Sequence, residues 1–461
     1  MEKKGVKMAE KRFQVNPVGK GQRNLGRWDM FATWFGANAN NGTWYIGGII
    51  AACGLVGGFW AMLIASVISY LFLSLVSLMG YETGLSTTTL SRASFGIRGS
   101  VIPSVINFIM FMGWTAVNTF IAATSLSFIF HSFFGWPLFG QSGGNKGLIV
   151  GILIMSVLHI LSIISGQKSV RIIERVGIIL VIFFVLWEGI VVFRHVSFHE
   201  LLNWTVPVKD RMPFGAALDI LAAFNLAWVT SAADFSRFAK TKSVSTVSAF
   251  WGALVGVVSF AAMGMSTAIS IALTSGIYNP DNSDPSTVAN ELGLGTVAMV
   301  VIVLTSMTSN AVNLQASGSA LNNLFSRLSL RSSLLIATVI ATLLTFIPLI
   351  NGDFLAVFTA FLDYIGMLLG PIIAIMVVDY FCDKETYVQP NFEQERGAFW
   401  YKGGFNYPVI ILFAFGVLLY LILSNVAFLK ETTGATFIVM AIVALLYYGL
   451  LQYQSKRKAK Q

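Results

Sequence analysis

The chain of 461 residues is strongly apolar, because 56% of its residues are hydrophobic and only 11% are charged. A soluble domain carries about a quarter charged residues, so this composition excludes an ordinary soluble protein and predicts an integral membrane protein. The formal charge of +9 does not indicate a nucleic-acid partner, because the basic residues lie between apolar segments, where they set membrane orientation.

Runs of roughly 20 apolar residues, the length that crosses a bilayer as a helix, recur along the whole chain. Their centres lie near residues 43, 67, 115, 156, 182, 224, 258, 305, 342, 367, 415 and 442. The connections between them are short, which predicts one polytopic all-α domain with 12 transmembrane helices over residues 28–453. We expect a cytoplasmic tail at 1–27 and a basic cytoplasmic tail at 454–461.

The basic residues support this topology. With the amino terminus in the cytoplasm, alternate segments place all but five of the 30 lysines and arginines on the cytoplasmic side. The exceptions are Lys146, Arg194, Lys209, Arg211 and Lys430. Such an asymmetry predicts both termini inside. The short loops and minimal tails indicate the plasma membrane of a prokaryote.

The first apolar segment is interrupted by polar and small residues. Residues 36–42 read GANANNG, with three amides and two glycines at membrane depth. Unpaired backbone groups there cost several kcal/mol each, so a break persists only where protein or a water-filled cavity satisfies it. Broken helices of this kind build substrate and ion sites in secondary transporters. The alternative is that these residues only pack between helices.

The third segment carries Trp114 and Asn118, four residues apart and therefore on one helix face. A flat heteroaromatic ligand suits this pair, because the ring can stack on the indole while the amide reads its edge. A packing or interfacial role for the tryptophan is the alternative.

The sixth segment is interrupted as well, since residues 224–234 read FNLAWVTSAAD. With five helices per repeat, segments one and six occupy corresponding positions in two halves of opposite topology. This predicts a leucine-transporter-type (LeuT-type) 5+5 inverted repeat, with repeats at about 28–194 and 213–382 and two extra helices at about 405–453. In the eighth segment, residues 308–313 add hydroxyls and amides in the sequence TSNAVN.

Three further motifs carry a resemblance to a known family. They are LSRASFGIRG at 90–99, ADFSRF at 233–238, and GMLLGP at 366–371 followed by DYF at 379–381. In this order, they resemble the signatures of the nucleobase:cation symporter-1 family along most of the chain. The resemblance implies a symporter that imports its substrate by alternating access.

Within that family, the chain is similar to the purine/cytosine permease branch. The hydantoin and allantoin branch typically has a glutamine where this chain has Asn118, and an aromatic residue where it has Asn225. The resemblance implies that Trp114 and either Trp228 or Phe224 sandwich the base. The polar residues expected to complete the substrate site are Asn40, Asn118, Asn225, Asn310 and Asn313.

The resemblance also implies a cation site, formed by carbonyls in the helix-one break and hydroxyls on helix eight. These map onto Gly36, Ala39 and Thr308. Sodium-dependent members usually show a Ser-Thr pair on helix eight, whereas this chain has Met307 followed by Thr308. Either Ser309 supplies the missing hydroxyl to sodium, or the coupling cation is a proton.

A proton would need a carboxylate inside the membrane. The candidates are Glu188, Asp219 and Asp363, and of these only Asp363 is central in its segment. We expect headgroup water to solvate Glu188 and Asp219. A structural hydrogen bond is the alternative role for each of the three.

The sequence therefore predicts a secondary active transporter for a nucleobase, either a purine or cytosine, coupled to H+ or Na+. The alternatives are an allantoin, hydantoin or thiamine-precursor pyrimidine symporter, and, in another class, a channel or substrate sensor. The histidines form no metal or catalytic motif, so an enzyme is not expected. We expect no cofactor and no metal other than a possible sodium ion. We expect membrane lipid around the protein, and no obligatory protein partner.

Overall fold

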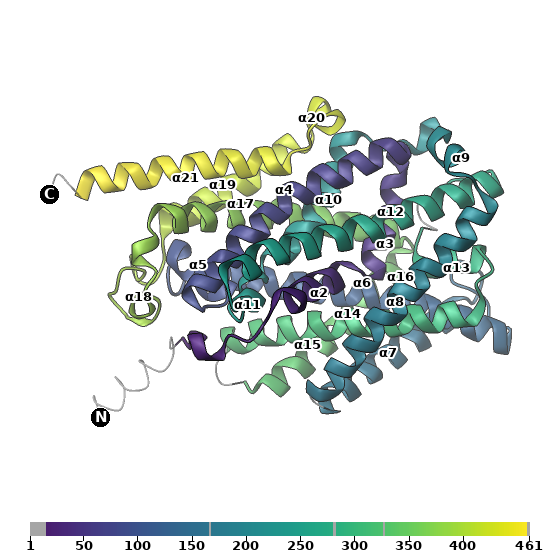
Figure 1. Ribbon diagram of the computed structural model, residues 1–461, viewed down its shortest axis with the longest axis horizontal. Coiled ribbons are helices and arrows are strands. Elements are labelled where there is room, and N and C mark those ends of the chain that lie inside the picture. The colour runs from purple at the N-terminus through teal and green to yellow at the C-terminus, as the bar shows by residue number, and fades with distance from the viewer. Residues whose placement is uncertain (1–14, 166, 280–282, 326–327, 459–461) are drawn as a thin grey trace.

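The computed structural model describes residues 15–165, 167–279, 283–325 and 328–458, and this part of the chain is built from helices without a named strand (Figure 1). Unbroken long helices are α4 (Gly54–Thr83), α6 (Val101–Phe134), α7 (Asn145–Ser165), α8 (Gln167–His195), α12 (Ala249–Ser275), α14 (Gly295–Leu324), α15 (Leu330–Thr345), α17 (Phe354–Cys382), α19 (Tyr407–Leu423) and α21 (Thr436–Lys458). Short connecting helices are α5 (Thr87–Phe95), α9 (Phe198–Asn203), α13 (Pro285–Glu291), α16 (Ile347–Asn351), α18 (Gln389–Glu393) and α20 (Ala427–Glu431).

Both predicted breaks are confirmed. The first segment forms α2 (Arg27–Asn38) and α3 (Asn41–Ile50), separated by two non-helical residues. The sixth segment forms α10 (Phe214–Val229) and α11 (Ala232–Ser236). Asn40 starts α3 because its side-chain oxygen accepts a hydrogen bond from the Thr43 amide at 3.0 Å, which is the role of an N-cap residue.

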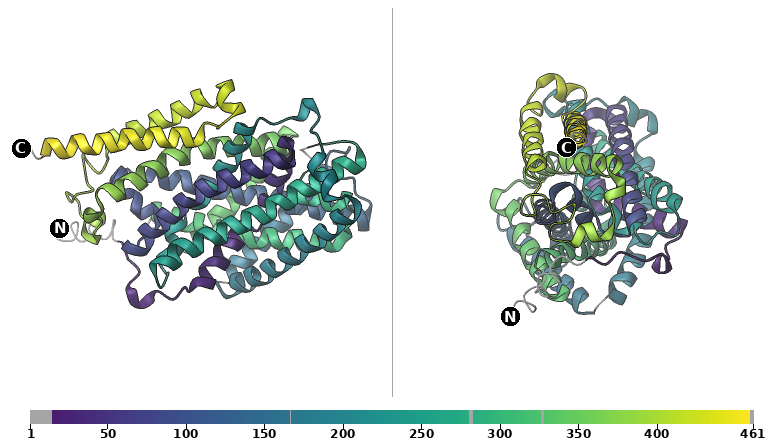
Figure 2. Two further views of the ribbon diagram at one scale, coloured as in Figure 1. Left: turned by 45° about the horizontal axis from the view of Figure 1, so that its top comes forward. Right: turned by 90° about the vertical axis from the view of Figure 1, so that its left-hand side faces the viewer.

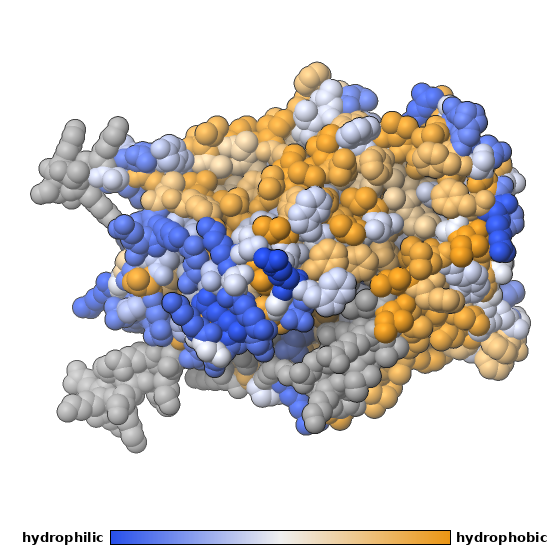
Figure 3. Space-filling view, viewed as in Figure 1, coloured by the Kyte–Doolittle hydropathy of each residue, from blue (hydrophilic) through white to orange (hydrophobic). Residues whose placement is uncertain are grey.

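The helices form an elongated bundle with an apolar band between polar ends, as a membrane protein requires (Figures 1 and 3). Within the described residues, nine helical stretches are long and apolar enough to cross a membrane, and one of them, Asn41–Thr83, contains two of the predicted runs. The shorter α19 is apolar too. Each predicted centre lies in a helix, so the arrangement fits twelve crossings. The described part of the chain begins and ends at the same end of the bundle, as an even number of crossings demands (Figure 1).

Helix α12 supports both halves of the broken first helix through glycines. A Cβ on Gly264 would lie 2.1 Å from the Trp44 carbonyl oxygen of α3, and one on Gly252 would lie 2.4 Å from the Phe31 carbonyl oxygen of α2. On α3, Gly47 is similarly close to Ala261. Small residues let membrane helices approach at backbone distance. This contact holds α2 and α3 on one platform despite the break between them.

The last two long helices, α19 and α21, pack along one side of the bundle against α17 (Figures 1 and 2). Asp219 of α10 fixes the start of α21, because its carboxylate accepts hydrogen bonds from the amides of Ala435 and Thr436 at 2.8 Å. The repeat boundaries predicted from the sequence remain predictions.

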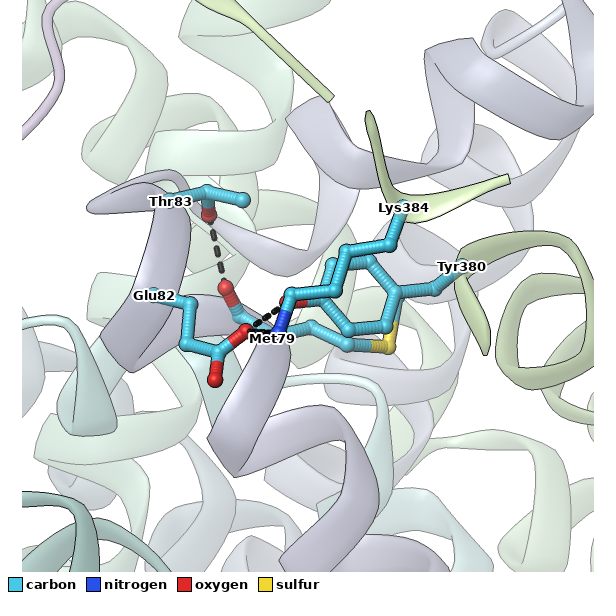
Figure 4. Close-up of polar contacts among 5 residues, drawn as sticks. All are labelled: Met79, Glu82, Thr83, Tyr380 and Lys384. Carbon is cyan, nitrogen blue, oxygen red and sulfur yellow. Dashed lines mark hydrogen bonds and ion pairs between the residues drawn. The ribbon is translucent and has the colours of Figure 1, made fainter. Parts of the chain in front are cut away.

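At the end of the bundle where the described chain starts and ends, a polar contact joins α4 to the segment after α17. Glu82 forms an ion pair with Lys384 and accepts a hydrogen bond from the Tyr380 hydroxyl (Figure 4). Thr83, beside Glu82, donates to the Met79 carbonyl at 2.7 Å. The ends of two helices from different halves of the chain are thereby held together.

Candidate functional site

The predicted site is centred on the buried indole of Trp114, of which 8% is exposed. Three phenylalanine rings meet it nearly edge-on: Phe224 of α10 at 5.1 Å, and Phe358 and Phe361 of α17 at 5.8 and 5.5 Å between centroids. Edge-to-face packing of this kind stabilises aromatic groups beyond their buried area. The third, sixth and tenth predicted segments therefore meet at one aromatic group.

The broken first helix reaches the same place. A Cβ on Gly42 would lie 3.1 Å from the Asn40 Oδ1 atom, 3.5 Å from the Trp114 ring and 3.9 Å from the Asn118 Oδ1 atom. Asn40, Trp114 and Asn118 are thus brought together around a position that carries no side chain, as predicted for the substrate site. Gly42 was not singled out by the sequence, although it lies inside the interrupted motif.

Several polar atoms at or near this group are buried without a partner in the described structure. They are the Trp114 Nε1 donor and the Oδ1 acceptors of Asn118, Asn310 and Asn313. The Asn118 amide nitrogen donates to the Trp114 carbonyl of its own helix at 3.1 Å, which leaves the oxygen available. A buried unsatisfied polar atom costs about 1–3 kcal/mol. Such atoms around an aromatic surface are what a polar, flat ligand would satisfy.

A cavity of about 620 Å³ adjoins the aromatic group between α6, α15, α16 and α17. Gly113, Phe358 and Phe361 are among the residues that line it. Its volume falls in the range of about 300–1,000 Å³ that is typical of small-molecule sites. Neither Trp114 nor Asn118 lines it, so this space adjoins the aromatic group through Phe358 and Phe361 and not through the unpartnered polar atoms.

The two aromatic candidates of the sixth segment have different surroundings. Phe224 contacts Trp114, whereas Trp228, one turn further along α10, lies edge-on to Trp34 of α2 at 6.4 Å. Of the two alternatives left open by the sequence, the structure brings Phe224 to Trp114, but the two rings contact each other edge-on at 88° and are not parallel as a sandwich requires.

Asn225 lies in a separate polar network. It is fully buried, and its amide contacts the Tyr70 hydroxyl at 2.8 Å and the Ser66 hydroxyl at 3.1 Å, both on α4. The Tyr70 hydroxyl oxygen also lies 2.6 Å from the Asn38 Oδ1 atom. This network joins α2, α4 and α10, so the structure does not place Asn225 in the Trp114 group.

Asn310 contacts a different face of α6. Its amide nitrogen lies 3.2 Å from the Thr115 carbonyl, 2.9 Å from the Thr119 hydroxyl and 3.3 Å from His159 Nε2 of α7. The structure therefore places the Asn310 nitrogen between α6, α7 and α14, while its Oδ1 atom is buried without a partner in the described structure. Asn313 lies two turns from Ser306 and thus on the side of α14 that meets α3.

The residues expected to bind a cation belong to α2, to the break after it and to α14. Gly36 lies in the last turn of α2. Ala39 follows the last residue of this helix, and its amide donates to the Phe35 carbonyl at 2.7 Å. On α14, Thr308 donates to the Leu304 carbonyl at 3.0 Å, and Ser309 to the Thr305 carbonyl at 3.3 Å.

The hydroxyls of α14 that contact the broken helix belong to Thr305 and Ser306, which bond the Asn41 amide. The sequence reading missed these three residues. The sequence does contain a pattern that could have identified them, because Thr305 and Ser306 form an adjacent hydroxyl pair and Asn41 follows Asn40 in the break.

The three carboxylates also differ from expectation. Asp363 is exposed on α17, and Asp219 is held by the backbone amides at the start of α21. Glu188 is 0% exposed, and neither of its oxygens has a partner in the described part of the chain. The expectation that headgroup water solvates Glu188 is wrong, because α8 turns this side chain into the protein.

The fold and the site define a membrane transporter with two broken helices. Residues 17–450 match the model of a family described as permeases for cytosine/purines, uracil, thiamine and allantoin, and the chain belongs to this family. The predicted membership of the nucleobase:cation symporter-1 family is thereby confirmed. The chain is a multi-pass permease and not an enzyme.

Two curated relatives cover nearly the whole chain. It is 25% identical over 482 residues to the putative purine-cytosine permease YxlA of Bacillus subtilis (strain 168), covering 98% of each. It is 23% identical over 470 residues to the allantoin permease of the same organism, covering 94% of this chain and 91% of that protein.

Solved structures confirm the predicted LeuT-type fold. The inward-facing conformation of Mhp1 matches with a TM-score of 0.79 at 19% identity, over 96% of this chain and 95% of that one. A closed conformation of Mhp1, a nucleobase-cation-symport-1 family transporter with bromovinylhydantoin bound, matches with a TM-score of 0.76 at 17% identity, over 96% of both chains.

Proposed function

We propose that this permease imports a nucleobase, either a purine or cytosine, together with a cation. The observation that carries the proposal is the set of buried, unpartnered polar atoms beside the Trp114 indole. Trp114 Nε1 can donate a hydrogen bond, and the oxygens of Asn118 and Asn313 can accept one. A nucleobase has a flat aromatic face and both donors and acceptors on its rim, so it complements this set.

The same chemistry provides selectivity. A site that hydrogen-bonds its ligand rejects analogues that lack those groups, because its own buried amides are then left unpaired. Plain aromatic compounds therefore bind poorly, whereas bases with a suitable edge bind well. Asn40, beside Gly42, borders this site, but both polar atoms of its amide already have partners within the break. Alternating access then follows from motion of one helix bundle against the other around this site.

Cation coupling supplies the driving force. A neutral base gains nothing from the membrane potential, whereas one positive charge carried inward across about 100 mV contributes roughly 2.3 kcal/mol, or about fifty-fold accumulation. Of the three carboxylates, Glu188 is the best proton carrier, because it is buried and without a partner. It follows Phe184 by one turn of α8, and Phe184 contacts Trp44 of α3 at 5.6 Å between ring centroids. Glu188 therefore lies close to the broken helix.

The test is uptake of radiolabelled cytosine and hypoxanthine into proteoliposomes that contain the purified protein, with proton and sodium gradients imposed separately. We expect saturable uptake of one base driven by the proton gradient. Downhill, non-saturable flux would indicate a channel, and binding without flux would indicate a sensor.

A second candidate substrate is allantoin or a hydantoin. It is favoured by the similarity to the allantoin permease. Saturable uptake of allantoin with no uptake of either base would support this alternative.

A further inference from the structure

The Asn41 side chain occupies a cluster of three oxygens on one turn of α14. Its amide nitrogen lies 3.0 Å from the Ile302 carbonyl oxygen, 2.9 Å from the Thr305 hydroxyl and 3.0 Å from the Ser306 hydroxyl. An amide nitrogen has two hydrogens, one fewer than the acceptors that surround it. The oxygens therefore converge on one point, and uncharged carbonyl and hydroxyl oxygens arranged in this way suit a hard cation.

The amide orientation follows from the chemistry of the cluster. The Ile302 carbonyl can only accept a hydrogen bond, so the nitrogen of Asn41 and not its oxygen faces it. Asn41 is 4% exposed and is the first residue of α3. The contact therefore joins the broken first helix directly to α14.

The other side of the break is satisfied by side chains as well. The Ala37 carbonyl accepts from the Asn40 amide at 2.7 Å, and the Asn38 carbonyl accepts from the Thr43 hydroxyl. Carbonyls at the end of a half-helix carry partial negative charge and coordinate cations in transporters with broken helices. Here two of them already have donors from their own chain. On α14, the Asn41 amide nitrogen takes the three oxygens that would otherwise face an ion.

We propose that the Asn41 amide takes the place of a monovalent cation between the broken first helix and α14. The chain then needs no sodium at this position, and its coupling ion binds elsewhere. That an ion is coupled to transport rests on the proposed function, but the occupancy of the oxygen cluster by Asn41 does not. Removal of the amide should leave three converging oxygens that accept sodium.

The experiment compares the melting temperature of purified wild-type and Asn41→Ala protein in detergent, in NaCl and in choline chloride of equal concentration. We expect no difference between the two salts for wild type. Asn41→Ala should be less stable in choline chloride and should gain on the order of 2–5 °C in NaCl, because an ion that binds only the folded state stabilises it.

Two further variants serve as matched controls. Asn225→Ala removes another buried, hydrogen-bonded amide and should lower the melting temperature equally in both salts. Thr305→Val added to Asn41→Ala removes one oxygen of the cluster at nearly constant volume, and the sodium response should disappear.

If Asn41→Ala does not fold, Asn41→Asp keeps the shape and adds a negative charge that needs a cation, so its stability should depend on NaCl still more strongly. The proposal would be overturned if NaCl stabilised wild type as much as it stabilises the Asn41 variants. It would also be overturned if Asn41→Ala and Asn41→Asp each melted at the same temperature in NaCl and in choline chloride. These readouts need no substrate, so failure of nucleobase uptake leaves the test of Asn41 intact.

Discussion

The two sides of the broken first helix differ in whether their buried polar groups have hydrogen-bond partners. Toward α14, the Asn41 amide nitrogen is surrounded by three oxygens of the same chain. Toward α6, the Asn118 oxygen and the Trp114 nitrogen are buried and have no partner in the described structure. On the α14 side the protein itself supplies the hydrogen-bond partners, whereas on the α6 side a ligand can supply them.

This difference teaches how to separate structural from functional polar residues in a membrane. Both sides are rich in amides, so residue type does not distinguish them. A polar group that the chain satisfies stabilises the fold, whereas one left unsatisfied carries a cost that only a ligand removes.

The largest effect is expected for Trp114→Ala on the open side. Loss of base stacking should weaken nucleobase binding by about 1–3 kcal/mol, or roughly 5- to 150-fold. Isothermal titration of purified protein measures this change. Trp251→Ala, at a tryptophan of α12 that is 52% exposed, is the control and should bind as wild type does. An unchanged affinity in Trp114→Ala would remove the indole from the site.

Glu188→Gln should abolish proton-driven accumulation, which amounts to about fifty-fold at 100 mV for one charge, while leaving exchange of base across the membrane intact. The reason is that the amide cannot take up or release a proton. The measurement is concentrative uptake in proteoliposomes against counterflow of preloaded base. Asp363→Asn, at an exposed carboxylate, should accumulate normally; the reverse result would return the role to Asp363.

Asn118→Ala and Asn225→Ala should give opposite results. The first removes an acceptor that only the ligand uses, so we expect affinity to fall about tenfold with little change in melting temperature. The second removes an amide that bonds α4, so melting temperature should fall while affinity is kept. Thermal melts and titrations on both proteins test this pair. Equal effects would contradict the division between open and closed networks.

The smallest effect is expected for Gly42→Ala. The added methyl group would lie 3.1 Å from Asn40 Oδ1 and 3.5 Å from the Trp114 ring, so it narrows the space beside the indole. We expect binding to weaken only a few-fold, since an added methylene costs about 1 kcal/mol. Gly449→Ala on α21 meets no atom within 4 Å and is the matched control. Tighter binding in Gly42→Ala would mean that the ligand does not use the space beside Gly42.

The sequence by itself determined the membrane class, the helical segments, both breaks and the family. It could do so because these properties depend on local composition: apolar length, amides and glycines at membrane depth, and basic residues between segments. Trp114 and Asn118 were also within its reach, because four residues on a helix fix a common face.

Only the tertiary structure decided which of the amides face a ligand. Asn225 looks the same as Asn118 in the sequence, yet Tyr70 and Ser66 satisfy both of its polar atoms from another helix. The contact of Asn41 with Thr305 spans 264 residues, and the burial of Glu188 depends on how α8 is rotated in the bundle. Helix rotation and long-range packing are set by the whole fold, so no local pattern can report whether a polar group has found a partner.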